Sequence, residues 1–213
     1  MKTIFLIGNL ASGKSTAARY LESLGARRID LDVLAKSLYT PGSELVSNLA
    51  EEFGWHILDE NGEVRTSELA RCAFESPEST ARLNSIVHPV LKQKLADIIM
   101  PVQCCSTVIP KFPLTVVEVS APMSFLDAFS LADDVVAIAA PCDVRRTRAL
   151  NRGMTAEDFD SRSAVQPTDE QLCNLARTVI DNTRTDDFLF KSLDLYLMEK
   201  GILLTSNGGS RAC

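Results

Sequence analysis

Short runs of apolar residues alternate with helix-type patterns along most of the chain. The first run, residues 3–7, reads Thr-Ile-Phe-Leu-Ile, as expected for a strand that is buried on both faces of a parallel sheet. Further strands are predicted at residues 28–30, 115–119, 135–139 and 178–181. Because helical patterns lie between these runs, we predict an α/β protein whose parallel sheet is flanked by helices on both faces.

Residues 33–94 lack a strand pattern. Helical patterns are predicted over residues 41–53, over residues 67–74 and from the Ser76-Pro77 pair onward, since serine caps helices and proline suits their first turn. The His88-Pro89 pair is expected to interrupt this last helix, which resumes over residues 90–99. We therefore expect a helical insert at residues 33–100, suited to holding a second substrate, and then a loop at residues 100–113.

Basic residues concentrate in the region 141–162. A helix that starts at Pro141 and stops at Gly153 is predicted to carry Arg145, Arg146, Arg148 and Arg152. Arg148 and Arg152 are four residues apart and would share one helix face. Such arginines on short helices after a strand predict a lid over residues 141–170 that closes on phosphates, with a solvated basic face as the alternative. The last predicted helix, residues 186–200, would pack on the sheet.

Composition narrows the class of protein. The chain has 213 residues, 46% of them hydrophobic and 23% charged, which is ordinary for a globular protein. Its net charge of −6 argues against nucleic-acid or membrane partners. The six cysteines show no C-x-x-C spacing, so a metal or redox role is not expected. We expect a cytoplasmic monomer or small homo-oligomer that acts on small molecules.

The most specific motif is the stretch from Gly8 to Ser15, Gly-Asn-Leu-Ala-Ser-Gly-Lys-Ser. It matches the phosphate-binding loop G-x-x-x-x-G-K-[ST], and it has the required strand before it and helix after it. Loop amides at a helix N-terminus favour an anion, Lys14 would contact the β- and γ-phosphates, and the Ser15 hydroxyl would hold Mg²⁺. The alternative is a chance glycine-rich turn. The predicted nucleotide-binding residues are Gly8, Asn9, Ala11, Ser12, Gly13, Lys14, Ser15 and Thr16.

Carboxylates at the end of the second predicted strand suggest the acceptor side. A kinase needs an acid near the γ-phosphate, and strand alternation would place Asp30 and Asp32 on one face at the sheet edge where ligands bind. Asp32 is predicted to be the base, with Asp30 orienting it or ordering Mg²⁺ waters; alternatively, Asp32 caps a helix beginning at Val33. Glu118 is predicted to serve Mg²⁺ or to form a structural ion pair.

The order and spacing of these features resemble the dephospho-CoA kinase family over residues 2–183. Besides the phosphate loop, the matching elements are Leu24-Gly25 with Ile29-Asp30-Leu31-Asp32, Pro41-Gly42, Phe53-Gly54, Asp59-Glu60-Asn61-Gly62, Leu83 with His88-Pro89, the lid residues Arg148, Arg152 and Gln166, and the run from Ala176 to Asn182. The chain departs from the family at residues 120–124, where a Pro-Leu-Leu-x-Glu pattern is usual. Asn9 and Ala11 also stand where glycine is frequent.

The resemblance implies a P-loop kinase that uses Mg²⁺-ATP to phosphorylate the ribose 3′-hydroxyl of dephospho-CoA. The implied residues are Asp32, Lys14 and Arg148 for catalysis, Arg148, Arg152 and Asn182 for the nucleotide, Asp30, Asp32, His88 and Gln166 for the acceptor, and Ser15 and Asp32 for Mg²⁺. It also implies one domain over residues 1–205, built from a core at residues 1–32, 114–140 and 176–205, the insert at 33–100 and the lid at 141–170.

Two alternatives remain open at this point. A P-loop kinase of a nucleoside or another small metabolite would share the loop and the Asp30/Asp32 pair. A nucleotide-binding relative without kinase activity would fit the altered residues 120–124, although Lys14, Ser15 and Asp32 are all retained.

Overall fold

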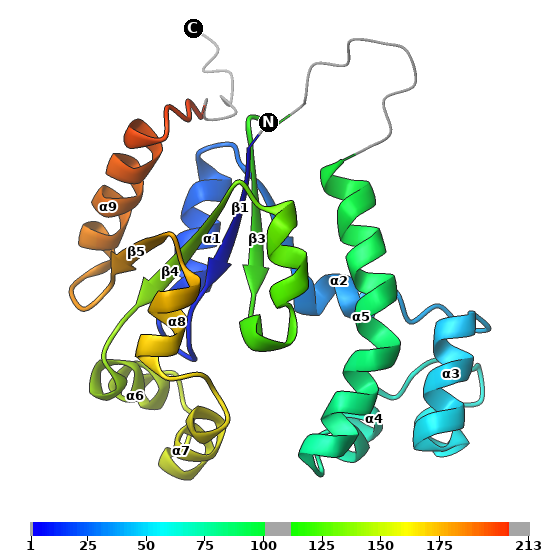
Figure 1. The fold of residues 1–213 in the computed structure, drawn as a ribbon. Coiled ribbons are helices and arrows are strands. Elements are labelled where there is room, and N and C mark those ends of the chain that lie inside the picture. Colours follow the sequence, from blue (N-terminus) through cyan, green and yellow to red (C-terminus); the bar gives the residue numbers. More distant parts are fainter. Residues whose placement is uncertain (1, 101–111, 205–213) are drawn as a thin grey trace, which may run out of the picture. The chain divides into compact units, whose positions relative to one another are not determined.

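The computed structural model describes residues 2–100 and 112–204 of the chain. The chain forms two compact units: the first comprises Met1–Leu31 and Gln103–Cys213, and the second comprises Asp32–Val102. Figure 1 traces the elements of both units along the sequence.

The first unit is built on a five-stranded sheet in the order β2-β3-β1-β4-β5, and each neighbouring pair is parallel. The strands are β1 (Lys2–Ile7), β2 (Arg27–Asp30), β3 (Leu114–Val119), β4 (Asp134–Ala139) and β5 (Thr178–Asp181). These bounds confirm the predicted strands to within one residue at each end. For the three central strands the reason is a run of consecutive apolar residues, since both faces of a parallel sheet are covered.

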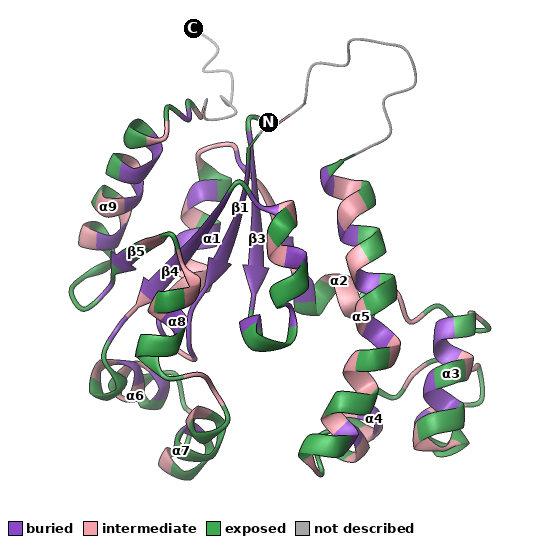
Figure 2. Ribbon diagram, viewed as in Figure 1, coloured by how far each residue is buried: buried purple, intermediate pink, exposed green. Residues whose placement is uncertain are grey.

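Helices cover both faces of this sheet, as predicted. On one face, α1 (Lys14–Ser23) and α9 (Asp186–Glu199) pack against a core that includes Ile4 and Leu6. On the other, Phe5 meets Phe129 of η3 (Leu126–Leu131) edge to face, with ring centroids 5.8 Å apart, and α8 (Asp169–Leu175) lies against β4. The three central strands β1, β3 and β4 are therefore buried along nearly all of their length, whereas the edge strands β2 and β5 each have a single buried residue (Figure 2).

Between β3 and α8 the first unit carries three more short helices. They are η2 (Pro122–Ser124), α6 (Cys142–Asn151) and α7 (Ala156–Ala164). Side-chain caps start α7 and α8: the hydroxyl of Thr155 accepts from the amide of Asp158, and Thr168 forms a capping box with Gln171. These caps satisfy amides that otherwise have no partner at a helix start.

The amino-terminal end of β4 holds a buried carboxylate. Asp134 accepts hydrogen bonds from Tyr196 (3.1 Å) and Thr178 (3.3 Å) and forms an ion pair with Lys200 at 2.8 Å. Burial raises the pKa of Asp134, but Lys200 and Tyr196 outweigh burial and hold that pKa below its ordinary value. The same burial, with the charge of Asp134, raises the pKa of Tyr196. This group ties α9 to the sheet.

The second unit is helical, as predicted for the insert. Its elements are α2 (Leu31–Ser37, which begins at the last residue of the first unit), α3 (Glu44–Phe53), η1 (Trp55–Ile57), α4 (Thr66–Ala73) and α5 (Pro77–Ile99). Apart from an isolated bridge between Leu58 and Val64, its described residues contain no strand. The predicted start at Ser76 is confirmed, because its hydroxyl accepts from the amide of Ser79.

The predicted interruption at His88-Pro89 is wrong, because α5 runs through it for 23 residues. A proline inside a helix costs one hydrogen bond, but Val87, Leu91 and Leu95 are buried at a spacing of four on one face, and their packing keeps the helix intact. Although α5 is long, no helix in the described ranges is apolar enough to cross a membrane. The loop predicted at residues 100–113 lies almost entirely outside the described residues.

Candidate active site

The loop after β1 depends on its two glycines. A Cβ atom on Gly8 would lie 2.5 Å from Oγ of Ser12 and 2.9 Å from the carbonyl oxygen of Ile138. Gly13 has φ of 100°, and a Cβ there would lie 2.1 Å from Nδ2 of Asn182. Because a side chain at either position would collide with neighbouring atoms, packing requires both glycines, and at Gly13 the positive φ requires glycine as well.

Lys14 and Ser15 begin α1, and their side chains bind different partners. The partner of Lys14 directly follows β3, and the partner of Ser15 lies on β3. Nζ of Lys14 donates to Oγ of Ser120 at 2.7 Å. Oγ of Ser15 donates to Oε2 of Glu118, also at 2.7 Å. The side chains that the sequence predicts for phosphate and Mg²⁺ therefore lie beside one another at the helix N-terminus, where backbone amides favour an anion.

Glu118 is 2% exposed and is shared between two neighbours. One carboxylate oxygen accepts from Ser15, and the other forms an ion pair with Nε of Arg28. Burial lowers the pKa of Arg28, but the hydrogen bond and charge of Glu118 outweigh it and raise that pKa above its ordinary value. The structure thus contains the ion pair that was one predicted alternative for Glu118, and a role of Glu118 toward Mg²⁺ stays a prediction.

Arg28 was not predicted as a site residue. Besides Glu118, it lies 3.8 Å from a carboxylate oxygen of Asp30, so that it connects the two acids at the ends of β2 and β3. The available signal was the requirement that a buried strand carboxylate have a cationic partner. The sequence does not show which of the chain's 22 lysines and arginines fills that role.

Asp30 lies at the carboxyl end of β2, in register with Glu118. Since β1, β2 and β3 are parallel, this end of the sheet is also the end that carries the phosphate loop. The prediction that Asp30 and Asp32 share one strand face is wrong, because β2 ends at Asp30 and α2 starts at Leu31. Asp32 is an exposed residue in the first turn of α2, so the alternative in which it caps a helix starting at Val33 is also wrong.

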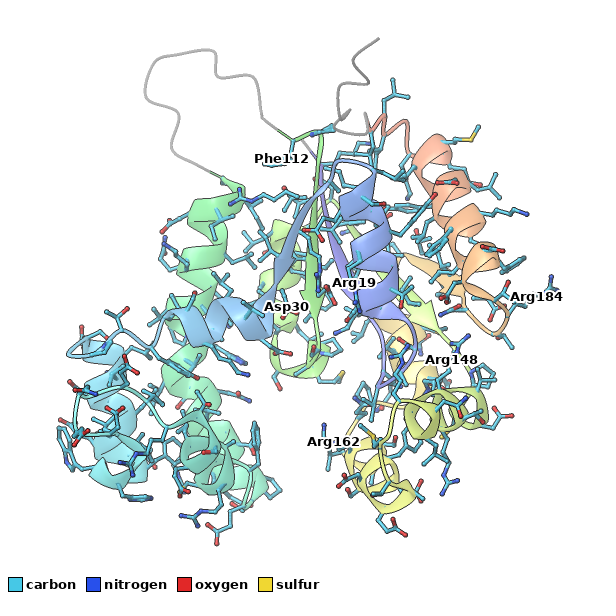
Figure 3. The ribbon with its side chains drawn as sticks, turned by 180° about the vertical axis from the view of Figure 1, so that it is seen from behind. Arg19, Asp30, Phe112, Arg148, Arg162 and Arg184 are labelled. Carbon is cyan, nitrogen blue, oxygen red and sulfur yellow. The ribbon has the colours of Figure 1, made fainter. Side chains whose placement is uncertain are left out.

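The four arginines predicted on one lid helix have different environments. Arg145 is buried and pairs with Asp169, and Arg146 pairs with Asp160 of α7 at 3.1 Å. Arg148 donates from NH2 to the carbonyl oxygen of Arg184 at 2.9 Å (Figure 3). The placement of Arg152 on the helix is wrong, because α6 ends at Asn151 and Arg152 is its exposed C-cap. Arg145 and Arg146 are therefore held in ion pairs, and the buried Arg145 does not fit the alternative of a solvated basic face.

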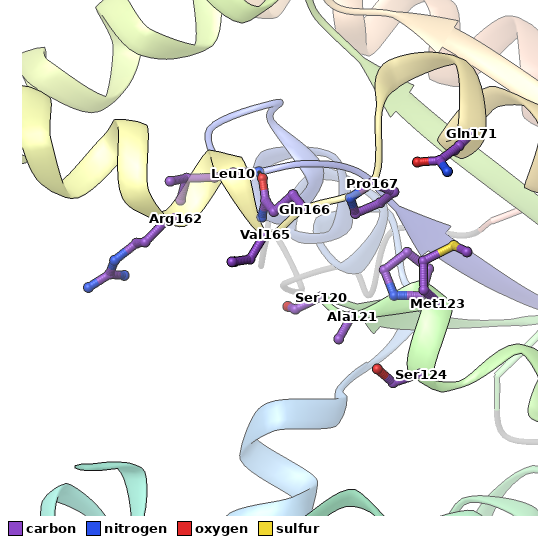
Figure 4. A pocket seen from close by; sticks show the side chains of 11 residues that line it. Leu10, Ser120, Ala121, Met123, Ser124, Arg162, Val165, Gln166, Pro167 and Gln171 are labelled. Atoms are coloured by element: carbon purple, nitrogen blue, oxygen red, sulfur yellow. Dashed lines mark hydrogen bonds between the residues drawn. The ribbon is translucent and has the colours of Figure 1, made fainter. Parts of the chain in front are cut away.

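Gln166 and Asn182 contact the backbone of the phosphate loop. Oε1 of Gln166 accepts from the amide of Leu10 at 2.9 Å. Asn182, which is 1% exposed, donates to the carbonyl oxygen of Ser12 at 2.7 Å. A cavity of about 570 Å³ opens beside the contact between Leu10 and Gln166 (Figure 4). It is lined by Leu10, Ser120, Ala121, Pro122, Met123, Ser124, Arg162, Val165, Gln166, Pro167 and Gln171.

The structure therefore gathers most of the predicted site residues in the first unit. The loop contacts Gln166 through Leu10 and Asn182 through Ser12, Thr16 lies on α1, and Asp30 lies at the same end of the sheet. Asp32 and His88 belong to the second unit. Among the described residues, no group of three or more His, Cys, Asp or Glu side chains suits a metal ion.

Known proteins resemble this chain in sequence and in fold. A family model described as dephospho-CoA kinase matches residues 2–187. A dephospho-CoA kinase of Corynebacterium diphtheriae is 37% identical over 191 residues, which cover 89% of this chain and 92% of that relative. A crystal structure from Thermus thermophilus has a TM-score of 0.73 at 27% identity, over 93% of this chain and 97% of the other. A dephospho-CoA kinase from Campylobacter jejuni has a TM-score of 0.65 at 21% identity, over 94% and 99%.

The parallel sheet, the phosphate loop that opens α1 and the arginine-bearing helices after β4 define a P-loop kinase fold. With the family model matching most of its length, the chain belongs to the dephospho-CoA kinase family.

Proposed function

We propose that this chain transfers the γ-phosphoryl group of ATP to the ribose 3′-hydroxyl of dephospho-CoA, giving coenzyme A and ADP. The observation that carries this proposal is a complete phosphate loop, with Lys14 and Ser15 in place, in a chain that matches the dephospho-CoA kinase family over residues 2–187. The lid arginine Arg148 supports it, since guanidinium groups neutralise charge on transferring phosphoryl oxygens.

On the donor side, the loop amides and Lys14 would hold the β- and γ-phosphates of ATP. Arg148, Arg152 and Asn182 are proposed to complete the nucleotide site. Mg²⁺ fits the oxygen donors present, because this ion usually takes one or two protein ligands together with phosphate oxygens and water. Ser15 and Asp32 would hold it, Glu118 lies beside Ser15, and the ion would supply charge neutralisation for the phosphates.

On the acceptor side, Asp32 is proposed to accept the proton of the attacking hydroxyl. Asp30 would orient the reacting groups from the end of β2, where Arg28 lies beside its carboxylate. His88 and Gln166 are proposed to contact dephospho-CoA, and the helices of the second unit are proposed to bind its pantetheine arm. We propose that the protein works in the cytoplasm as a monomer or small homo-oligomer.

The decisive experiment is a turnover panel with purified protein, Mg²⁺-ATP and one acceptor at a time. We expect coenzyme A and ADP to form with dephospho-CoA and no product to form with nucleosides or shikimate. Shikimate belongs in the panel because a shikimate kinase from Acinetobacter baumannii shares the fold, with a TM-score of 0.53. Turnover only with another acceptor, or ATP binding without any turnover, would contradict the proposal.

A further inference from the structure

Asn9, inside the phosphate loop, is bonded to the segment that follows the lid helices α6 and α7. Its buried side-chain amide donates one hydrogen bond to the carbonyl oxygen of Pro167 at 3.0 Å and one to Oδ1 of Asp169 at 2.9 Å. The next residue, Leu10, donates its backbone amide to Gln166 of the same segment; Figure 4 shows Leu10 beside Gln166 and Pro167. We call residues 166–169 the lid-base segment.

Asp169 is in turn connected to the end of strand β4 through Arg145. Its Oδ1 atom also accepts from NH2 of Arg145 at 3.2 Å. Arg145 is 5% exposed, and its Nε donates to the carbonyl oxygen of Ala140, which directly follows β4, at 2.9 Å. A guanidinium, a carboxylate and an amide thus form a continuous connection from the end of β4 to the phosphate loop. Hydrogen bonds to charged groups are stronger than neutral ones, and a buried guanidinium needs its partner.

This connection reaches the loop at a turn that contains a strained backbone conformation. The carbonyl oxygen of Asn9 accepts from the amide of Ser12 at 3.0 Å, and the turn it closes contains Ala11 at a φ of 59°. A non-glycine residue in the left-handed region costs free energy, and it persists only where its surroundings hold it there. A turn of this kind needs external support to keep its shape before a ligand arrives.

We propose that Asn9, Asp169 and Arg145 are positioning residues that hold the phosphate loop in its nucleotide-binding conformation. The affinity for ATP then depends on two side chains, Asp169 and Arg145, that act through Asn9 on the loop backbone. The inference rests on the proposed function only in that ATP is the ligand of the loop; it does not depend on the acceptor.

The test is calorimetric measurement of the Kd for Mg²⁺-ATP with the full chain and its variants. Asn9→Asp keeps the shape but turns both donors into acceptors that face the Pro167 carbonyl and the Asp169 carboxylate, so we expect Kd to rise at least about tenfold. Asp169→Ala should also raise Kd. Asp169→Asn should raise it less, because an amide oxygen still accepts from Asn9. The matched control is Glu170→Ala, an exposed acid next in sequence, which should leave Kd unchanged.

A double variant shows whether Asn9 and Asp169 affect the Kd for Mg²⁺-ATP through one shared connection or independently. If Asn9 and Asp169 act together, Asn9→Gly combined with Asp169→Ala should raise Kd no more than the more damaging single change. Circular dichroism establishes that each variant is folded, and Asn9→Gly replaces Asn9→Asp if the latter does not fold. Unchanged Kd in these Asn9 variants, or fully additive effects in the double variant, would overturn the inference. If the unaltered chain did not bind ATP, the proposed function itself would fail.

Discussion

Ala11 is the only non-glycine residue with a positive φ in the described parts of the chain, at 59°. It lies in the phosphate loop between Asn9, whose side chain is bonded to the lid-base segment, and Gly13, whose φ of 100° allows α1 to start. Single residues in this loop are therefore constrained by backbone conformation, and substitutions there have effects of predictable sign.

Ala11→Gly should stabilise the protein. An L-residue in the left-handed region costs about 1–2 kcal/mol, whereas glycine adds about 0.4–1 kcal/mol of unfolded-state entropy, so we expect the free energy of unfolding to rise by up to about 1.6 kcal/mol. Urea denaturation measures this. The matched control is Ala81→Gly, the same change at an exposed position inside α5. It should lower the free energy of unfolding by about 1 kcal/mol. A decrease in both variants would contradict the strain argument.

Gly13→Ala should abolish measurable ATP affinity, because the new Cβ would lie 2.1 Å from the side chain of Asn182, which supports the loop. The matched control is Gly42→Ala, which also has a positive φ, of 75°, but meets no atom within 4 Å. Equilibrium binding of ATP distinguishes the two. We expect the Gly42 variant to bind ATP as the unaltered chain does; equal binding by the Gly13 variant would show that the loop tolerates displacement.

Asp32→Ala tests the proposed base. We expect turnover with dephospho-CoA to fall by about 10²–10⁴, the usual loss when a general base is removed, with the Kd for ATP nearly unchanged. Steady-state kinetics and calorimetry give the two quantities separately. Glu60→Ala removes an exposed acid of the same unit and should change neither. A loss of ATP affinity as large as the loss of turnover would point to a role in nucleotide or Mg²⁺ binding instead.

At the scale of elements, α9 is joined to the rest of the first unit along its middle and at its end. In its middle, Phe190 stacks on Tyr20 of α1 with ring centroids 4.3 Å apart, and Asp194 accepts from the hydroxyl of Tyr20 at 2.7 Å. Burial and this contact raise the pKa of Tyr20 to about 12. Near its end, Tyr196 and Lys200 meet Asp134 of β4. Polar contacts as well as apolar packing therefore hold α9 against α1 and the sheet.

Asp134→Asn should lower the free energy of unfolding at pH 7 by about 1.5–3 kcal/mol, the value of hydrogen bonds to a charged group. The pKa of Asp134 is below its ordinary value, so its ionised form adds stability that is present above the unfolded-state pKa and is lost as pH falls through the folded-state pKa. The difference between variant and unaltered chain should therefore shrink below about pH 4. Urea denaturation at pH 7 and pH 3 tests this prediction, and Glu199→Gln, a change at an exposed acid, is the control. A difference in the free energy of unfolding that is the same at both pH values would contradict the prediction.

At the scale of the whole molecule, parallel strands bring distant parts of the chain to one edge of the sheet. The phosphate loop follows β1, Glu118 lies near the end of β3, and Asp30 ends β2. This topology was predicted because helical patterns separate the apolar runs, and crossover connections between parallel strands follow from that alternation. The helical second unit was also predicted, from the absence of a strand pattern across 62 consecutive positions, residues 33–94.

Local sequence determined the strands, most helices, the caps at Ser76 and Thr168, and the phosphate loop. Each of these depends on residues that are adjacent or a few positions apart, so the pattern and the physical cause lie in the same short stretch. The same reasoning misplaced Asp32 on a strand and broke α5 at Pro89, because helix boundaries also respond to packing against distant residues.

Only the tertiary structure decided which side chains meet around the loop. Glu118 lies 90 residues from Arg28 in sequence, Asp169 lies 160 residues from Asn9, and Ser120 lies 106 residues from Lys14. Because these groups are charged or polar, the sequence indicates that each needs a partner when it is buried. The choice among many possible partners is made by the folded chain, because the sheet register and the docking of the helices set the distances between them.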